Sequence, residues 1–179
     1  YYPGANPLAL KVLYHAETGT ILGAQGVGKD GVDKRIDVLA VAIQGGLHVE
    51  DLIDLELCYA PPFGSAKDPV NLAGMIGDNI RAGRVSVVQW SEVEALGQAG
   101  QLLDVRDDAE VKRGTIPGAL HIPLNQLRNR LGALPKNKEL IVFCQSGQRS
   151  YNACRILMQH GFACKNVSGA YKTWSGVKR

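Results

Sequence analysis

The second half of the chain contains an uninterrupted apolar run, Leu140-Ile141-Val142-Phe143, directly after Glu139. A run in which every position is apolar is typical of a strand that is covered on both faces, as in a parallel sheet. A polar loop follows, and Ser150 to His160 then has the period of a helix. The pattern predicts a buried strand, a tight loop and a helix in succession.

The first half begins with an alternating pattern. Lys11 to Tyr14 alternates polar and apolar residues as a strand does, Glu17 to Thr20 supplies a turn, and Ile21 to Gly28 supplies the returning strand. The sequence therefore predicts a hairpin at this end of the chain.

Two helices are predicted after the hairpin. Asp33 to Gln44 has apolar residues at helical spacing and ends at Gly45-Gly46. A second helix is predicted to begin at Asp68-Pro69, because aspartate can cap the first amides and proline fits the first helical position. A hairpin with two helices has little core to bury by itself, which favours an interface domain.

The two patterns divide the chain into domains at residues 1–84 and 85–179. Ile80 to Arg84 is expected to end the last helix of the first domain, and Val85 to Val88 to form the first strand of the second. A linker this short predicts a limited range of domain orientations.

Composition narrows the class of protein. The chain has 179 residues, 45% of them hydrophobic, and a net charge of +3. So small a charge, without a run of basic residues, argues against a nucleic-acid partner. No stretch of about 18 apolar residues occurs, so no membrane span or membrane partner is predicted. The opening Tyr1-Tyr2-Pro3-Gly4, without methionine, predicts a piece of a longer protein.

Cys144 directly follows the predicted buried strand and carries the candidate chemistry. Gln145, Ser146, Gly147, Gln148 and Arg149 follow it. The amides of such a loop, with the start of the next helix, form an anion cradle that lowers the pKa of a cysteine and favours its nucleophilic thiolate. Arg149 is expected to offer a bidentate fork to an anionic group that arrives at the sulfur.

The other cysteines, Cys58, Cys154 and Cys164, match neither a CxxC nor a zinc-finger spacing, so no metal site is predicted. Cysteines in apolar surroundings are commonly just buried. A resolving role for Cys154 is disfavoured, because it is expected about ten residues, or roughly 15 Å, along the helix. Four cysteines without a disulfide pattern favour a reducing cytoplasm.

Several segments of the second half occur in an order that few families share. They are Leu102 to Arg106, Gly114 to Leu124, the cysteine loop, Gly161-Phe162 and Val167 to Trp174. On these segments, residues 85–179 resemble the rhodanese family of sulfurtransferases, although Ser168 replaces the first of two usual glycines. The resemblance implies an α/β domain with a mostly parallel, doubly wound sheet. Asp104 and Arg106, at a predicted strand end, are expected to support the neighbouring loops.

Four residues separate Cys144 from Arg149. In this fold that length is typical of sulfurtransferases, whereas related phosphatase domains have one residue more and a cradle wide enough for phosphate. The resemblance implies that Cys144 attacks a sulfane sulfur, carries it as a persulfide on the loop amides, and passes it to an acceptor. No metal or general base is required. Phosphatase or arsenate reductase chemistry is the disfavoured alternative.

The first domain also contains characteristic sequence segments. They are Ile21 to Gln25, Val32 to Val38, Leu57 to Phe63 and Ser65 to Pro69. On them, residues 1–84 resemble the dimerisation domain of the FAD-dependent pyridine nucleotide-disulfide oxidoreductases. The branch indicated is the single-cysteine one, which includes coenzyme A-disulfide reductase, NADH oxidase and NADH-dependent persulfide reductase. Some members carry a rhodanese domain at the C-terminus, which is the domain order seen here.

This second resemblance implies an α+β interface domain and a homodimeric parent enzyme. It also implies that FAD, NAD(P)H and coenzyme A serve the full-length parent, while this chain alone binds none of them. In coenzyme A-disulfide reductases, tyrosines of this domain reach across the dimer to the partner's site. Tyr59 matches one of them and Tyr1 or Tyr2 the other, with plain packing as the alternative.

The two resemblances imply a sulfurtransferase module within a coenzyme A-disulfide or persulfide (polysulfide) reductase. The substrates would be small sulfur compounds, namely thiosulfate, polysulfide, persulfides and coenzyme A thiols. A second hypothesis is a non-catalytic rhodanese domain that senses sulfide or redox state and regulates the attached reductase by docking.

Overall fold

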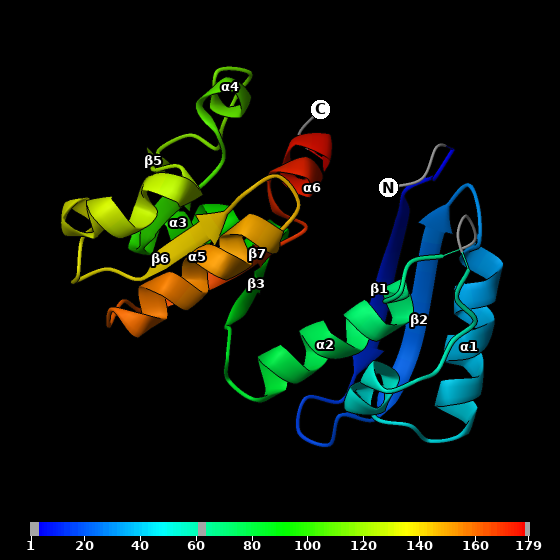
Figure 1. Ribbon diagram of the computed structural model, residues 1–179. Coiled ribbons are helices and arrows are strands. Elements are labelled where there is room, and N and C mark those ends of the chain that lie inside the picture. Colours follow the sequence, from blue (N-terminus) through cyan, green and yellow to red (C-terminus); the bar gives the residue numbers. More distant parts are fainter. Residues whose placement is uncertain (1–3, 61–63, 178–179) are drawn as a thin grey trace. The chain divides into compact units, whose positions relative to one another are not determined.

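The computed structural model describes residues 4–60 and 64–177. The chain forms two compact units, which divide in the sequence between Gly83 and Arg84. Figure 1 shows the helices and strands of each unit. Each unit has its own hydrophobic core, so each is described by itself.

The first unit is an antiparallel hairpin against which helices pack. Its elements are β1 (Leu8–Tyr14), β2 (Ile21–Gly28), α1 (Val32–Gln44), the 3-10 helix η1 (Val49–Ile53) and α2 (Pro69–Arg81). The predicted hairpin and both predicted helices are confirmed. Gly46, with φ +69°, follows α1 in the left-handed conformation that glycine adopts without steric cost.

The core of this unit joins residues from the hairpin and all three helices, including Ile21, Leu39, Leu52 and Val70. α2 lies close to η1 because Gly74 has no side chain there. A Cβ at that position would lie 2.9 Å from the backbone nitrogen of Ile53. The helical layer therefore depends on a small residue at one contact.

The start of α2 is tied to the rest of the unit by Asn71. The Asp68 carboxylate accepts a hydrogen bond from the Val70 amide at 3.0 Å, as the capping prediction requires. The Asn71 side-chain oxygen accepts from the Asp68 amide at 3.0 Å, and its nitrogen donates to the carbonyls of Leu52 (2.9 Å) and Leu55 (3.0 Å). One buried amide thus satisfies groups from two segments.

Replacing Asn71 by leucine is expected to lower the free energy of unfolding by about 1–3 kcal/mol, because the buried Asp68 amide and Leu52 carbonyl lose their partner. Urea denaturation followed by far-UV circular dichroism measures the change. Asn152→Leu, on an exposed position of the other unit, is the control and is expected to change stability by no more than about 0.5 kcal/mol. Equal effects of the two substitutions would contradict the role given to Asn71.

The second unit is built on a five-stranded sheet in the order β3-β7-β6-β4-β5, with every neighbouring pair parallel. The strands are β3 (Val87–Gln89), β4 (Gln101–Asp104), β5 (Leu120–His121), β6 (Leu140–Phe143) and β7 (Cys164–Ser168). The helices are η2 (Trp90–Glu92), α3 (Val93–Ala99), α4 (Asp108–Val111), η3 (Leu124–Ala133), α5 (Gln148–Gln159) and α6 (Ala170–Val177). The parallel sheet confirms the predicted α/β class of this half, and the first unit confirms the α+β class of the other.

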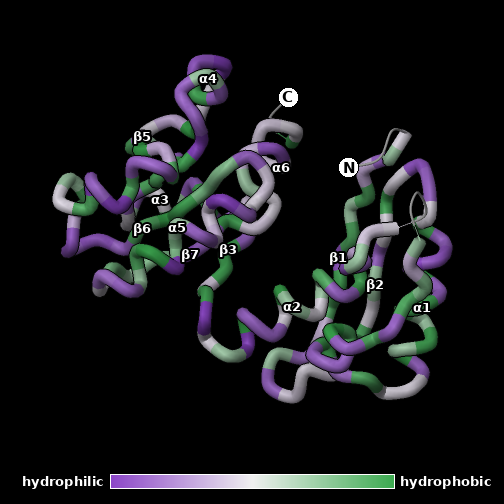
Figure 2. Tube along the Cα trace, viewed as in Figure 1, coloured by the Kyte–Doolittle hydropathy of each residue, from purple (hydrophilic) through white to green (hydrophobic). Residues whose placement is uncertain are grey.

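β6 is the central strand and is covered on both faces, as predicted. All four of its residues are fully buried, and Figure 2 shows this segment as hydrophobic. Ile141 and Phe143 belong to a core cluster with residues of α3 and α6, whereas Leu140 and Val142 alternate with them and face the side of α5. Figure 1 shows α5 in front of the sheet and α3 behind it. A residue directly after β6 therefore lies at the carboxyl edge of the sheet, where ligands of α/β folds bind.

Candidate active site

Cys144 occupies this edge position. It follows β6 directly, and the loop of Gln145, Ser146 and Gly147 leads into α5. Gly147 has φ +117°, a conformation that a residue with a side chain rarely adopts. The turn begins α5 at Gln148, two residues earlier than the sequence predicts, so Gln148 and Arg149 lie in the first helical turn.

Hydrogen-bond donors surround the Cys144 sulfur. The Gly147 amide donates to Sγ at 3.1 Å, and the Ser150 hydroxyl lies 3.4 Å from it. Burial raises the pKa of the Cys144 thiol, but hydrogen bonds from the Ser150 hydroxyl and from the amides of Ser150, Gly147 and Ser146 outweigh this effect and lower the pKa. The geometry favours a thiolate at the centre of the loop.

The carbonyl groups of the loop are held from α6 and β7. The amide of Tyr171 donates to the Cys144 carbonyl at 3.0 Å, and that of Lys172 donates to the Gln145 carbonyl at 3.0 Å. The Asn166 side chain donates to the Gly147 carbonyl at 3.4 Å. Because their carbonyls are bound on the outside, the loop amides are free to point inward at the sulfur.

The turn before α6 sets up this contact. Gly169 has φ +71° and Ala170 has φ +48°, so two successive residues adopt the left-handed conformation, one of them with a side chain. The position of Ser168, where the family resemblance departs, ends β7 directly before this turn. The turn keeps its form with serine there, because Ser168 itself is part of the strand.

Asp104 and Arg106 form a fully buried ion pair next to the loop. The Arg106 guanidinium donates to both carboxylate oxygens of Asp104, the closest at 2.7 Å. It also donates to the Gln145 side chain at 3.4 Å and lies 3.9 Å from the centre of the Tyr171 ring. The structure thus brings Arg106 into contact with the loop and with the residue that anchors it, whereas Asp104 binds Arg106.

Arg149 is bound by carboxylates. Its guanidinium donates to the two oxygens of Glu110 at 2.6 and 2.7 Å and to Asp107 at 3.1 Å. The fork that the sequence assigned to an arriving anion therefore engages Glu110 in this structure. Sequence reasoning missed Glu110. The available signal was the spacing of Asp107 and Glu110, a capping-box pattern that places both side chains at the start of α4.

The three remaining cysteines differ in burial. All four cysteines are free thiols, with Cys58 exposed and Cys154 and Cys164 buried. Cys154 comes six residues after Gln148, or about 9 Å along α5, so the predicted offset of ten residues was too long. Its neighbour is Cys164, whose sulfur lies 3.7 Å from the Cys154 carbonyl.

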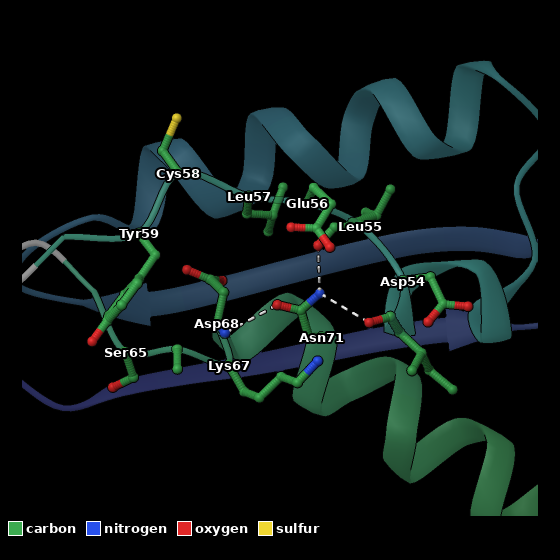
Figure 3. A pocket seen from close by; sticks show the side chains of 12 residues that line it. Asp54, Leu55, Glu56, Leu57, Cys58, Tyr59, Ser65, Lys67, Asp68 and Asn71 are labelled. Atoms are coloured by element: carbon green, nitrogen blue, oxygen red, sulfur yellow. Dashed lines mark hydrogen bonds between the residues drawn. The ribbon is translucent and has the colours of Figure 1, made fainter.

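Tyr59 lies in the first unit beside a pocket of about 210 Å³. Its side chain is 53% exposed, and Figure 3 shows it pointing away from the side chain of Cys58. Asp68 and Asn71 line the same pocket. Tyr1 and Tyr2, the other tyrosines expected at a cross-dimer site, lie outside the described residues.

The loop between β6 and α5 does not fit a dinucleotide such as FAD or NAD(P)H. Such cofactors place their pyrophosphate against the amides of a glycine-containing loop between a strand and a helix. The loop of that form after β6 already directs its amides at the Cys144 sulfur. Within residues 4–60 and 64–177 no three acidic, cysteine or histidine side chains are grouped to hold a metal ion. In the same residues no helix is long and apolar enough to cross a membrane.

Comparison with known families assigns each half separately. Residues 89–176 match the rhodanese-like domain, and residues 1–69 match the pyridine nucleotide-disulphide oxidoreductase dimerisation domain. Over 74 residues, 41% of this chain, the sequence is 50% identical to a coenzyme A disulfide reductase of Staphylococcus aureus and covers 17% of that protein.

Two solved structures are similar over nearly the whole chain. The reduced CoADR-RHD of Bacillus anthracis has a TM-score of 0.96 and 48% identity over 99% of this chain and 32% of that one. The NAD-dependent persulfide reductase from A. fulgidus has a TM-score of 0.86 and 39% identity over 97% of this chain and 32% of that one. The chain spans no more than 32% of the length of these relatives. It therefore consists of a pyridine nucleotide-disulphide oxidoreductase dimerisation domain followed by a rhodanese-like domain, with homologues among coenzyme A disulfide reductases and persulfide reductases.

Proposed function

We propose that the chain transfers sulfane sulfur through a persulfide on Cys144, as the rhodanese module of an FAD- and NAD(P)H-dependent coenzyme A-disulfide or persulfide reductase. The observation that carries the proposal is the set of donors around the sulfur, with the Gly147 amide at 3.1 Å and the Ser150 hydroxyl at 3.4 Å. In this proposal the domains are residues 1–84 and 85–179.

The transfer consists of two displacements at sulfur. The Cys144 thiolate attacks the sulfane sulfur of a donor, the donor S–S bond breaks, and its electron pair leaves with sulfite or a thiolate. An acceptor thiolate such as that of coenzyme A then attacks the outer sulfur of the Cys144 persulfide. The Cys144 thiolate is released and no external oxidant is consumed. The loop amides hold the negative charge at each stage.

The whole protein is proposed to be a homodimer that reduces the resulting persulfide or disulfide in its flavin-containing part. The dimerisation domain supports the assembly, and the free thiols support a reducing cytoplasm. Tyr59 is proposed to reach the partner's reductase site, which its exposure permits. FAD and NAD(P)H would supply the reducing electrons there, outside the described residues.

Intact-mass spectrometry tests the proposal. The chain is incubated with thiosulfate or polysulfide and then chased with coenzyme A. One added sulfur, roughly 32 Da, is expected on the chain and is expected to leave on addition of the thiol. Absence of the adduct with every donor would overturn sulfur transfer at Cys144.

One observation favours a second candidate, a sensing domain that regulates the attached reductase. Cys144 is only 1% exposed, which restricts the access of large acceptors. A sensor would acquire the added sulfur but retain it in the presence of coenzyme A, and the full-length protein would change its reductase rate when persulfidated. Rapid discharge by coenzyme A excludes this candidate as the main role.

Replacing Ser150 by alanine is expected to shift the pH dependence of Cys144 reactivity toward alkaline pH. The Ser150 hydroxyl is the largest of the contributions that lower the pKa of Cys144, so its removal raises the pKa and reduces the thiolate fraction at acid pH. A hydrogen bond to a charged group contributes about 1.5–3 kcal/mol, which implies a rate that is lower by about tenfold to a hundredfold at a pH below the pKa of Cys144 in both proteins. At a pH above the pKa of Cys144 in both the native protein and Ser150→Ala, the two alkylation rates should converge.

The measurement is the rate of iodoacetamide alkylation of Cys144 between pH 5 and pH 10, read by mass spectrometry of the peptide that contains it. Convergence at alkaline pH serves as the internal control for an intact loop. A constant ratio of the two rates at every pH would show that Ser150 acts on access to the sulfur and not on its ionisation.

A further inference from the structure

Arg149 follows the cysteine loop, and its guanidinium donates hydrogen bonds to Glu110 and Asp107. Glu110 binds it in a bidentate manner at 2.6 and 2.7 Å, and Asp107 adds a third contact at 3.1 Å. An arriving anion therefore meets a guanidinium whose charge is already compensated by carboxylates in good geometry.

Glu110 is held in place from a second direction. One of its carboxylate oxygens also accepts a hydrogen bond from the Asp107 amide at 3.0 Å, as part of the cap of α4. Its side chain is 19% exposed, against 71% for that of Asp107. Glu110 is thus the ordered member of the carboxylate pair, and Asp107 the solvated one.

The charged side chains of Arg149, Glu110 and Asp107 sum to a net negative charge. One guanidinium against two carboxylates leaves a formal charge of −1 for Arg149, Glu110 and Asp107. The hydrogen bond from Arg149 lowers the pKa of Glu110 to about 2, so Glu110 is ionised throughout the neutral range. The nearby Arg106 is neutralised by Asp104. A donor that approaches Cys144 therefore finds no uncompensated cation among these residues.

We propose that Glu110 is a specificity-determining residue that sets the charge class of the sulfur donor. Because it holds Arg149, the site disfavours a dianionic donor such as thiosulfate. It favours a hydropersulfide, whose electrophilic form RSSH is neutral at the reacting sulfur. The inference rests on the proposed sulfur transfer and adds the class of donor to it.

The two donors differ in the charge that the reaction brings together. With thiosulfate, the Cys144 thiolate attacks the sulfane sulfur of a dianion, and sulfite leaves with the electron pair. With a hydropersulfide RSSH, the thiolate attacks the terminal sulfur, the S–S bond breaks, and RS⁻ leaves while Cys144 carries –SSH. Both reactions balance without an oxidant, but only the first concentrates like charges near Glu110 and Asp107.

The test compares kcat/KM for thiosulfate with kcat/KM for the hydropersulfide of 2-mercaptoethanol, a neutral thiol. Glu110→Gln keeps the side chain and its oxygen acceptor but removes the charge. It is expected to raise kcat/KM for thiosulfate by on the order of tenfold and to leave that for the hydropersulfide within about twofold. Added salt should reduce the difference between the native protein and the variant.

The matched control is Glu139→Gln. Glu139 lies directly before β6, and its carboxylate pairs with Lys165 of β7. The substitution is expected to leave both values within about twofold. Arg149→Met should remove the gain in the Glu110→Gln background, because the gain depends on the freed guanidinium; a double-mutant cycle measures this coupling.

If Glu110→Gln still transfers sulfur but leaves the ratio of kcat/KM for the two donors unchanged, the inference is overturned and the proposed function stands. An equal loss with both donors in a folded variant would also overturn it, because Glu110 would then serve only the structure of α4. Failure of both donors to load Cys144 in the native protein would instead overturn the proposed function.

Discussion

Replacing Cys144 by serine is expected to lower the rate of sulfur transfer by roughly a thousandfold or more. A serine hydroxyl is not ionised at neutral pH, and an oxygen nucleophile cannot carry the persulfide that the second displacement requires. The surrounding donors, which stabilise negative charge on Sγ, then have no anion to stabilise. Steady-state transfer from polysulfide to coenzyme A measures the loss.

Cys58→Ser is the matched control, because Cys58 is an exposed thiol in the other unit. It is expected to leave the rate within about twofold. Cys154→Ala adds a buried control on α5, and near-UV circular dichroism verifies its fold. Retention of transfer in Cys144→Ser would disprove the persulfide mechanism. Hydrolysis of an aryl phosphate that depends on Cys144 would favour the phosphatase alternative instead.

Replacing Asp104 by alanine is expected to lower the free energy of unfolding of the second unit by about 3–5 kcal/mol. Both side chains of the Asp104–Arg106 pair are 1% exposed, so removal of the carboxylate leaves a buried guanidinium without its counter-charge. The Thr115 hydroxyl and the Arg106 amide also lose their acceptor. Guanidinium chloride denaturation followed by tryptophan fluorescence reports this unit, because both tryptophans, Trp90 and Trp174, belong to it.

Two variants separate the buried charge from a general loss of packing. Glu139→Ala breaks the partly exposed pair with Lys165 and is expected to cost no more than about 1 kcal/mol. The double variant Asp104→Leu with Arg106→Met removes both charges and is expected to recover part of the loss. If the double variant is less stable than Asp104→Ala, the uncompensated charge is not the cause.

The predicted elements that the structure reproduces are those with a local cause. The run Leu140 to Phe143 is apolar at every position, and the structure buries it on both faces. Asp68 precedes Pro69, and its carboxylate caps α2. In each case residues within a few positions of one another determine the conformation, so neighbouring sequence is sufficient. The start of α5 was predicted two residues late, because a left-handed glycine can stand inside a loop or directly before a helix.

The sequence by itself determined that Cys144 directly follows a buried strand, on a glycine-containing loop that leads into a helix. It also determined the resemblance to two families, because both rest on ordered runs of residues. The structure added the second layer of the site. Tyr171 and Lys172 bind the loop carbonyls, and Arg106 lies against the Tyr171 ring.

Only the tertiary structure decided the partner of Arg149. A guanidinium can pair equally well with an arriving anion or with any carboxylate within reach, and sequence spacing does not distinguish them. Glu110 precedes Arg149 by 39 residues and meets it because α4 and α5 follow adjacent parallel strands, whose carboxyl ends share one edge of the sheet. Local sequence thus sets where the nucleophile stands, whereas folding sets the charge that surrounds it, since electrostatic contacts act through space between segments far apart in the chain.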